Sequence, residues 1–127
     1  MSRFALLAAC GLLLAAGGCG GDDDKSNSGG AAGADLVVTV WPSGPDGPAR
    51  RHHVACERLG EGTPACRGLS RARLRPVPPD VACTEIYGGP ATARVRGTLQ
   101  GKPVDARFSR TNGCEIARWE RNRALFR

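Results

Sequence analysis

Four of the six cysteines of this 127-residue chain, all of them after residue 34, constrain its fold more than any other feature. They are Cys56, Cys66, Cys83 and Cys114. No CxxC pair occurs among them, and the only two histidines are adjacent, which is unlike the ligand spacing of a structural zinc site. In an exported protein, an even number of cysteines predicts a disulfide framework. Four cysteines allow three pairings, and their spacing alone does not choose between them.

The first residues of the chain predict export. Arg3 precedes an apolar run, FALLAACGLLLAAGG, that ends in small residues just before Cys19. This run is too short and wrongly flanked for a membrane span, and it is typical of a signal peptide over residues 1–18. Its AAGGC ending resembles a bacterial lipoprotein cleavage site, where Cys19 would be lipidated and become the new N-terminus. A plain secretory signal without lipid is the alternative, so we expect either a cell-surface lipoprotein anchored at Cys19 or a secreted protein.

The rest of the chain divides into a tether and one domain. Residues 19–34 are rich in Gly, Ser and Asp, and they predict a flexible tether because little in them can be buried. Residues 35–127 form one small domain, of a size that buries only about 60–65% of its unfolded surface. Disulfides therefore matter to its stability.

Hydrophobic patterns in this domain predict an α+β fold, a small antiparallel sheet with one or two short helices on one side. Short helices are expected within 67–76 and over 114–122. In the hairpin over 91–110, Arg94 or Arg96 would face Asp105 across a QGKP turn. The expected strands are 36–41, 50–56, the two arms of that hairpin, and a last short strand at 124–126.

Catalytic motifs are lacking in the sequence. His52 and His53 are neighbours on an expected strand, so their side chains point to opposite faces and cannot act together. No GxSxG motif, phosphate-binding glycine loop or metal-ligand pattern occurs. We therefore expect no enzyme activity, no cofactor and no metal.

The formal charge of +6 comes mostly from arginine. Nucleic acid is a poor candidate partner for an exported protein. A soluble face, or general attraction to an anionic cell surface, is a simpler explanation than a specific anion site.

The stretch RPVPPDVACTEIYGGP, residues 75–90, is the most unusual part of the domain. Its prolines force an extended approach to Cys83, and the glycines and proline after Tyr87 let the chain turn back. An extended segment held at both ends can lie in a protease cleft as an added strand. A linking loop stapled for stability explains the same residues equally well.

Several separated features, in order, carry a family resemblance: LVVTV, a cysteine pair around a loop, DVACTEIY, TLQGKPV, NGCEI and the terminal ALF. From Leu36 to the C-terminus, the chain resembles the bacterial subtilisin inhibitor-like family. The resemblance implies an α+β fold with a five-stranded antiparallel sheet and two short helices. It also implies inhibition of an extracellular serine protease, commonly by a homodimer.

The resemblance further implies which residues do this. It selects the disulfides Cys56–Cys66 and Cys83–Cys114, and it places the reactive peptide bond two residues after the third cysteine, at Glu85–Ile86. Ala82, Cys83 and Thr84 would fill the protease subsites before that bond, and Ile86 and Tyr87 those after it.

The loop departs from the family at Glu85, where a long residue such as Met or Lys is usual. A carboxylate buried without a partner costs several kcal/mol, so Glu85 predicts a glutamate-selective serine protease as target, with an acid-tolerant subtilisin second. The alternative function is a non-inhibitory surface lipoprotein with an arginine-rich face that binds an anionic wall polymer or a protein. That face would comprise Arg94, Arg96, Arg107, Arg118 and Arg121.

Overall fold

The computed structural model describes residues 32–127. The expected signal peptide, the lipidation site at Cys19 and most of the tether lie outside these described residues. Within residues 32–127, no helix combines the length and apolar character needed to cross a membrane.

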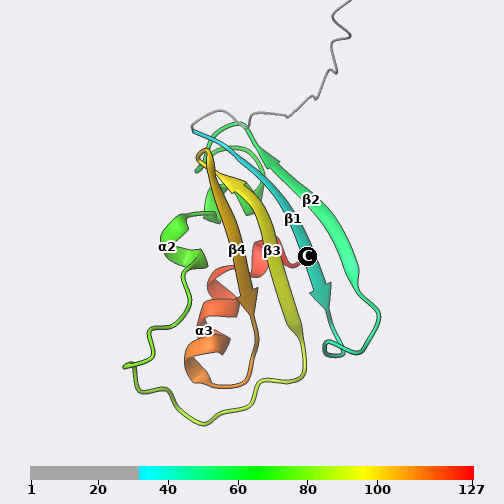
Figure 1. Cartoon of the computed structure of the whole chain (residues 1–127), viewed down its shortest axis with the longest axis vertical. Coiled ribbons are helices and arrows are strands. Elements are labelled where there is room, and N and C mark those ends of the chain that lie inside the picture. Colours follow the sequence, from blue (N-terminus) through cyan, green and yellow to red (C-terminus); the bar gives the residue numbers. More distant parts are fainter. Residues whose placement is uncertain (1–31) are drawn as a thin grey trace, which may run out of the picture.

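The domain is built on one antiparallel sheet with the strand order β2-β1-β3-β4 (Figure 1). Every neighbouring pair of strands is antiparallel, and Val38 of the central β1 lies opposite His52 on one side and Val95 on the other. The strands are β1 (Ala34–Trp41), β2 (Arg50–Cys56), β3 (Thr92–Leu99) and β4 (Lys102–Phe108).

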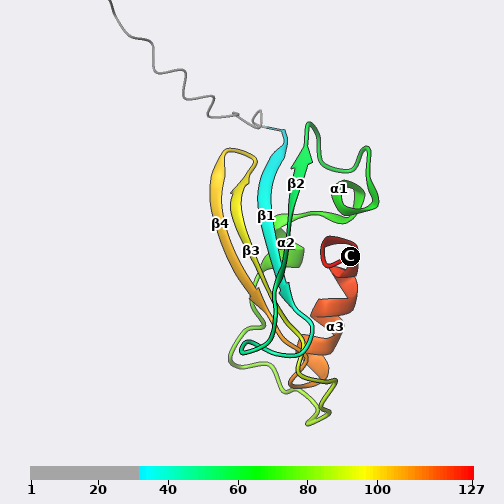
Figure 2. The ribbon, with the colours of Figure 1, turned by 90° about the vertical axis from the view of Figure 1, so that its right-hand side faces the viewer.

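Alternating side chains give the sheet one apolar face. Leu36 and Val38 of β1 and Val95 of β3 are fully buried on it. The helices pack against this face, as the side view of Figure 2 shows. They are α1 (Pro64–Gly68), α2 (Arg71–Leu74), α3 (Gly113–Arg121) and the short 3-10 helix η1 (Arg123–Leu125).

The β3–β4 hairpin has the expected turn and charge pair. Gln100 and Gly101 both have positive φ angles, 52° and 73°, which suits the tight primed turns that join antiparallel strands. Across the hairpin, the guanidinium of Arg94 donates two hydrogen bonds to the carboxylate of Asp105, at 2.8 and 2.7 Å. Arg96 is directly opposite Asp105 in register, and its Nε is 3.9 Å from a carboxylate oxygen.

The expected strand at 124–126 is wrong, and the sheet formed by residues 32–127 has four strands rather than five. After α3, the chain turns at once into η1, which points Leu125 and Phe126 into the core under the sheet. The Phe126 ring packs on Phe108 and Trp119, with centroids 5.0 and 4.4 Å apart. An apolar triplet can be buried by such packing without any strand pairing, so its composition did not determine its backbone.

The helices also differ from expectation in number. Residues 64–68 form α1, although no helix was expected before residue 67, and α1 begins at a Thr63 cap with Pro64 in its first turn. The helix expected within 67–76 is the single turn α2, and the helix expected over 114–122 is α3, which begins one residue earlier at Gly113.

Two disulfides join these elements. Cys56–Cys66 links β2 to α1, and both cysteines are buried in the core. Cys83–Cys114 links the segment after α2 to the first turn of α3, and both its cysteines are partly exposed. This is the sequential pairing that the family resemblance implies.

Candidate functional site

Residues 75–91 connect α2 to β3 without forming a helix or a strand. The segment runs along the end of the domain where α3 begins and β3 starts (Figures 1 and 2). It contains all six residues expected to contact a protease, Ala82 to Tyr87. The site is therefore an irregular segment supported from beneath by regular structure.

Three bonds hold the middle of this segment against the rest of the domain. The disulfide Cys83–Cys114 is the first, with the two Cα atoms 5.4 Å apart. The carbonyl oxygen of Thr84 accepts a hydrogen bond from the N–H of Gly113 at 2.9 Å. The N–H of Gly88 donates to the carbonyl oxygen of Arg110 at 2.7 Å. These anchors bracket residues 85–87, so the inferred reactive bond lies in a short span tied at both ends.

The side chains of that span point to solvent. Ile86 is 59% exposed and Tyr87 is 66% exposed, and Glu85 is exposed as well. Val81, just before the span, is 47% exposed. Of the four large hydrophobic side chains exposed in residues 32–127, only Val37 lies elsewhere. An apolar side chain left in water is unfavourable, and a concentration of them on one loop is typical of a binding surface.

Two glycines allow the segment to lie close to its support. A Cβ added at Gly113 would lie 2.0 Å from the Thr84 hydroxyl oxygen, so no other residue fits there without moving the loop. A Cβ added at Gly88 would lie 2.8 Å from the side chain of Ile116. The loop therefore rests directly on the first turns of α3.

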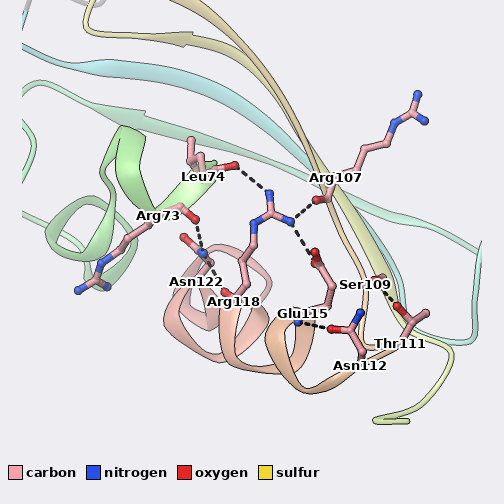
Figure 3. Close-up of polar contacts among 9 residues, drawn as sticks. All are labelled: Arg73, Leu74, Arg107, Ser109, Thr111, Asn112, Glu115, Arg118 and Asn122. Atoms are coloured by element: carbon pink, nitrogen blue, oxygen red, sulfur yellow. Dashed lines mark hydrogen bonds and ion pairs between the residues drawn. The ribbon is translucent and has the colours of Figure 1, made fainter. Parts of the chain in front are cut away.

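The support beneath the loop is itself well fixed (Figure 3). Asn112 caps α3, because its side-chain oxygen accepts a hydrogen bond from the N–H of Glu115 at 2.9 Å. The hydroxyls of Ser109 and Thr111 lie 3.1 Å apart in the preceding turn. The turn that supplies the Arg110 carbonyl and the Gly113 N–H is thus held by its own side chains.

Arg118 fixes α3 to the sheet and to α2 (Figure 3). Its side chain is almost fully buried, and it donates to the carbonyl oxygens of Arg107 at 2.6 Å and Leu74 at 2.8 Å. It also pairs with the Glu115 carboxylate at 3.2 Å and lies over the Phe108 ring, 4.0 Å from its centroid. A buried charge needs such partners, and together they set the position of the helix that carries Cys114.

His52 and His53 lie away from the loop, on β2. The two histidines point to opposite faces of the sheet, as expected. His52 Nε2 bonds to the Leu125 carbonyl oxygen at 2.8 Å on the helix side, and His53 Nε2 bonds to the Asp35 carboxylate at 2.6 Å on the open side. No cluster of three or more His, Cys, Asp or Glu side chains suited to a metal ion occurs in residues 32–127.

The five arginines expected to share one face do not share it. Arg94, Arg96 and Arg107 lie on the open face of the sheet, but Arg118 is buried beneath the opposite face and Arg121 is in the last turn of α3. This arginine-rich face was therefore wrongly assigned. Arg118 and Arg121 are close in sequence, but the side chain of Arg118 is buried and that of Arg121 is exposed.

The support of the loop was not predicted from the sequence. It consists of the carbonyl of Arg110 and the contact surfaces of Gly113 and Ile116. A signal for part of it was present. Asn112 followed by Gly113 is a helix cap followed by a residue without a side chain, immediately before the cysteine that ties the loop. The contribution of Arg110 is made by its backbone, so its residue type carries no signal.

Residues 85–87 therefore present an exposed, anchored stretch of peptide chain to a binding partner. Comparisons of the chain with protein-family models, with curated proteins and with solved structures found no match.

Proposed function

We propose that this protein is an exported serine protease inhibitor of the subtilisin inhibitor-like type, with Glu85–Ile86 as its reactive bond. One observation carries the proposal. Backbone anchors at Thr84 and Gly88 hold a span whose side chains are exposed and whose largest members are apolar. If the segment were only a linker, the exposure of Ile86 and Tyr87 to solvent would be unfavourable and would serve no purpose.

Inhibition follows from this preorganisation. A loop that enters a protease cleft already ordered loses little conformational entropy on binding, and interfaces of this kind bury about 800 Å² per partner and can be very tight. When the protease serine attacks the Glu85 carbonyl, the new ends stay in place. Cys83–Cys114 and the Thr84 bond hold one side, and the Gly88 bond holds the other. Resynthesis of the bond then competes with release.

Glu85 identifies the class of target. Its side chain is exposed and has no ion-pair partner among residues 32–127, so it is free to enter the primary pocket of a protease. A carboxylate in an apolar pocket loses its hydration without compensation. The expected target is a serine protease with a basic or histidine-containing pocket that selects glutamate, and a subtilisin that tolerates acidic residues is the second choice.

The test is an inhibition assay against a panel of extracellular serine proteases that includes both classes. The proposal predicts tight inhibition of a glutamate-selective enzyme, with slow cleavage between Glu85 and Ile86. Rapid cleavage in residues 82–87 without inhibition would mean that the loop is only a substrate. Cell-surface attachment through Cys19 remains part of this proposal, and Cys19→Ser tests it, because loss of the lipidated thiol should remove the protein from the membrane fraction.

A further inference from the structure

Figure 2 shows helices against one face of the sheet and none against the other, which we call the open face. The strand register places the side chains of the open face in rows. The strand register aligns Arg51 of β2, Thr39 of β1, Arg94 of β3 and Arg107 of β4 in one row across all four strands. The next row aligns His53, Val37, Arg96 and Asp105. Residues paired in register on one face lie side by side, so this open face collects four arginines that are distant in sequence.

The acidic residues on this face neutralise only part of its charge. The carboxylate of Asp105 forms ion pairs with Arg94, at 2.7 Å from its Nη2, and with Arg96, at 3.9 Å from its Nε. The carboxylate of Asp35 lies 2.6 Å from His53 Nε2. Four arginines against two aspartates leave a formal charge of +2 with His53 neutral. Within residues 32–127, the side chains of Arg51 and Arg107 are exposed and make no hydrogen bond or ion pair, and Arg107 interacts with Asp105 only through its charge, which helps to lower the pKa of that carboxyl.

The arginines surround a hollow rather than a flat surface. It has a volume of about 750 Å³, and its charged lining residues are Arg51, Arg94, Arg96 and Asp105, with Val37 and Thr39 between them. Arg107 is not part of this lining but is next to Arg94 in register. Thr39 is only 8% exposed although it lies on the open face, because Arg51 and Arg94 flank it on both sides. A ligand in this hollow would meet three guanidinium groups, the Asp105 carboxylate that Arg94 already binds, and the β-branched side chains of Val37 and Thr39.

We propose that this open face binds a linear polymer that carries repeated phosphate groups. Guanidinium groups bind phosphate through paired hydrogen bonds, and Arg51 and Arg107 have donors to spare. Neighbouring strands are about 4.8 Å apart, so the row from Arg51 to Arg107 spans roughly 14 Å, which suits several phosphates in a chain better than one ion. The assignment is independent of the proposed inhibitor function, because the anchored loop lies at the end of the domain on the helix side.

The same charges disfavour a second copy of the chain as the occupant. Stable homodimer interfaces have an apolar centre from which charged residues are depleted. Stacking two copies of this face would bring arginines together around Val37, the one large exposed hydrophobic side chain that the face offers. Like charges facing each other across an interface are unfavourable.

The experiment titrates the full exported chain with polyphosphate, with poly(glycerol phosphate) and with inorganic phosphate by calorimetry. We expect both polymers, or one of them, to bind with affinity that falls roughly 20-fold to 50-fold between about 50 and about 200 mM salt, as three or four phosphate contacts predict. If only one polymer binds, it identifies whether the ligand is a polyphosphate or a poly(glycerol phosphate). Inorganic phosphate should bind at least tenfold more weakly than the better polymer.

Two matched variants separate this face from general charge. Arg51→Gln with Arg107→Gln removes two exposed, unpaired charges and should weaken polymer binding by at least about tenfold. Arg58→Gln with Arg121→Gln removes two exposed arginines elsewhere and should change it less than about threefold. Equal losses in the two variants would overturn the proposal, as would an absence of polymer binding at low salt. A dimer that the first variant dissociates in sedimentation experiments would also overturn it. Protease inhibition should stay unchanged in both variants, so failure here and failure of the proposed function are distinguishable.

Discussion

The two disulfides of this domain show how differently the same bond is used. Cys56–Cys66 closes a ten-residue separation inside the core, where both cysteines are buried among apolar side chains. Cys83–Cys114 spans a separation of 31 residues and lies partly in solvent, where it ties an irregular segment to α3. Loop-entropy estimates give about 3 kcal/mol for the first bond and about 4 kcal/mol for the second.

The difference lies in what else holds each region. Around Cys56–Cys66, burial and strand pairing already determine the backbone, so the bond adds stability to a structure that other contacts specify. Around Cys83–Cys114, the loop has two backbone hydrogen bonds to the turn and helix start beneath it, at Thr84 and Gly88. We infer that the first disulfide stabilises the fold and that the second controls the conformation of the binding segment.

Removal of the Cys83–Cys114 disulfide should weaken protease inhibition more than any other change. In Cys83→Ser with Cys114→Ser, we expect inhibition to weaken by up to about 1,000-fold, because about 4 kcal/mol of chain ordering must then be supplied on binding. The loop should also be cleaved quickly. The measurements are the inhibition constant and the rate of cleavage, together with circular dichroism to verify that the domain is folded.

The matched variant is Cys56→Ser with Cys66→Ser. It should lower the Tm and leave the inhibition constant within about threefold at temperatures where the domain is folded. Equal loss of inhibition in the two variants, with both domains folded, would remove the distinction between the two bonds.

Substitution of Glu85 should have the next largest effect, and it should change selectivity rather than fold. Glu85→Leu removes an exposed carboxylate, so inhibition of a protease with an apolar pocket should improve by about 100-fold. Inhibition of a glutamate-selective protease should weaken. Glu61→Leu, at another exposed glutamate, is the control and should change neither constant. Unchanged constants for Glu85→Leu would show that Glu85 does not enter the primary pocket.

The contact between the loop and α3 should be sensitive to a single methyl group. Gly113→Ala places a Cβ against the Thr84 hydroxyl and should weaken inhibition about tenfold, since it strains the loop and its hydrogen bond from residue 113. Adding Thr84→Ala removes the hydroxyl and should restore much of the loss. Gly68→Ala meets only the end of the Arg73 side chain, at an ordinary contact distance of 3.5 Å, and serves as the control. A Gly113→Ala protein with normal inhibition would contradict the direct seating of the loop on α3.

The smallest effect should come from the exposed Arg94–Asp105 pair, far from both disulfides. The hydrogen bonds from Arg94 hold the pKa of Asp105 below its ordinary value. A carboxylate whose folded pKa is depressed contributes stability above its unfolded pKa, and this contribution is lost as the pH falls through the folded pKa.

Asp105→Asn should therefore lower the Tm slightly at neutral pH, and the difference from the native protein should vanish in acid below that pKa. Thermal melts across this pH range measure it, with Asp46→Asn, at an exposed aspartate in the β1–β2 loop, as control. A Tm difference that persists in strong acid would show that the pair is not its cause.

The regular parts of the fold were the parts that the sequence predicted well. β1 could be placed from its run of β-branched apolar residues, and the β3–β4 hairpin from its period-two alternation, so both follow from residue pattern alone. Residues 124–126 were wrongly predicted as a strand, because an apolar triplet is compatible with a strand and with a buried 3-10 turn. Only the packing of Phe126 on Phe108 distinguishes the two. Arg118 failed for a related reason, since burial of a charge depends on carbonyl groups from α2 and β4.

The candidate site divides in the same way. The prolines, the cysteine and the glycines of residues 75–90 indicate a constrained extended segment, because each acts on the backbone next to it. The anchors at Arg110 and Gly113 come from a turn more than 20 positions later, and hydrogen bonds made by backbone atoms leave no trace in residue type. The open arginine face likewise depends on strand register, which aligns Arg51 with Arg94 and Arg107.

The most direct test of the account is to incubate the protein with a glutamate-selective serine protease and to sequence the products while residual activity is followed. The account predicts strong inhibition, with one slow cut between Glu85 and Ile86 and with the two new ends still joined to the same folded domain. Rapid cutting of residues 82–87 without inhibition would contradict it, and so would inhibition accompanied by a cut at any other bond.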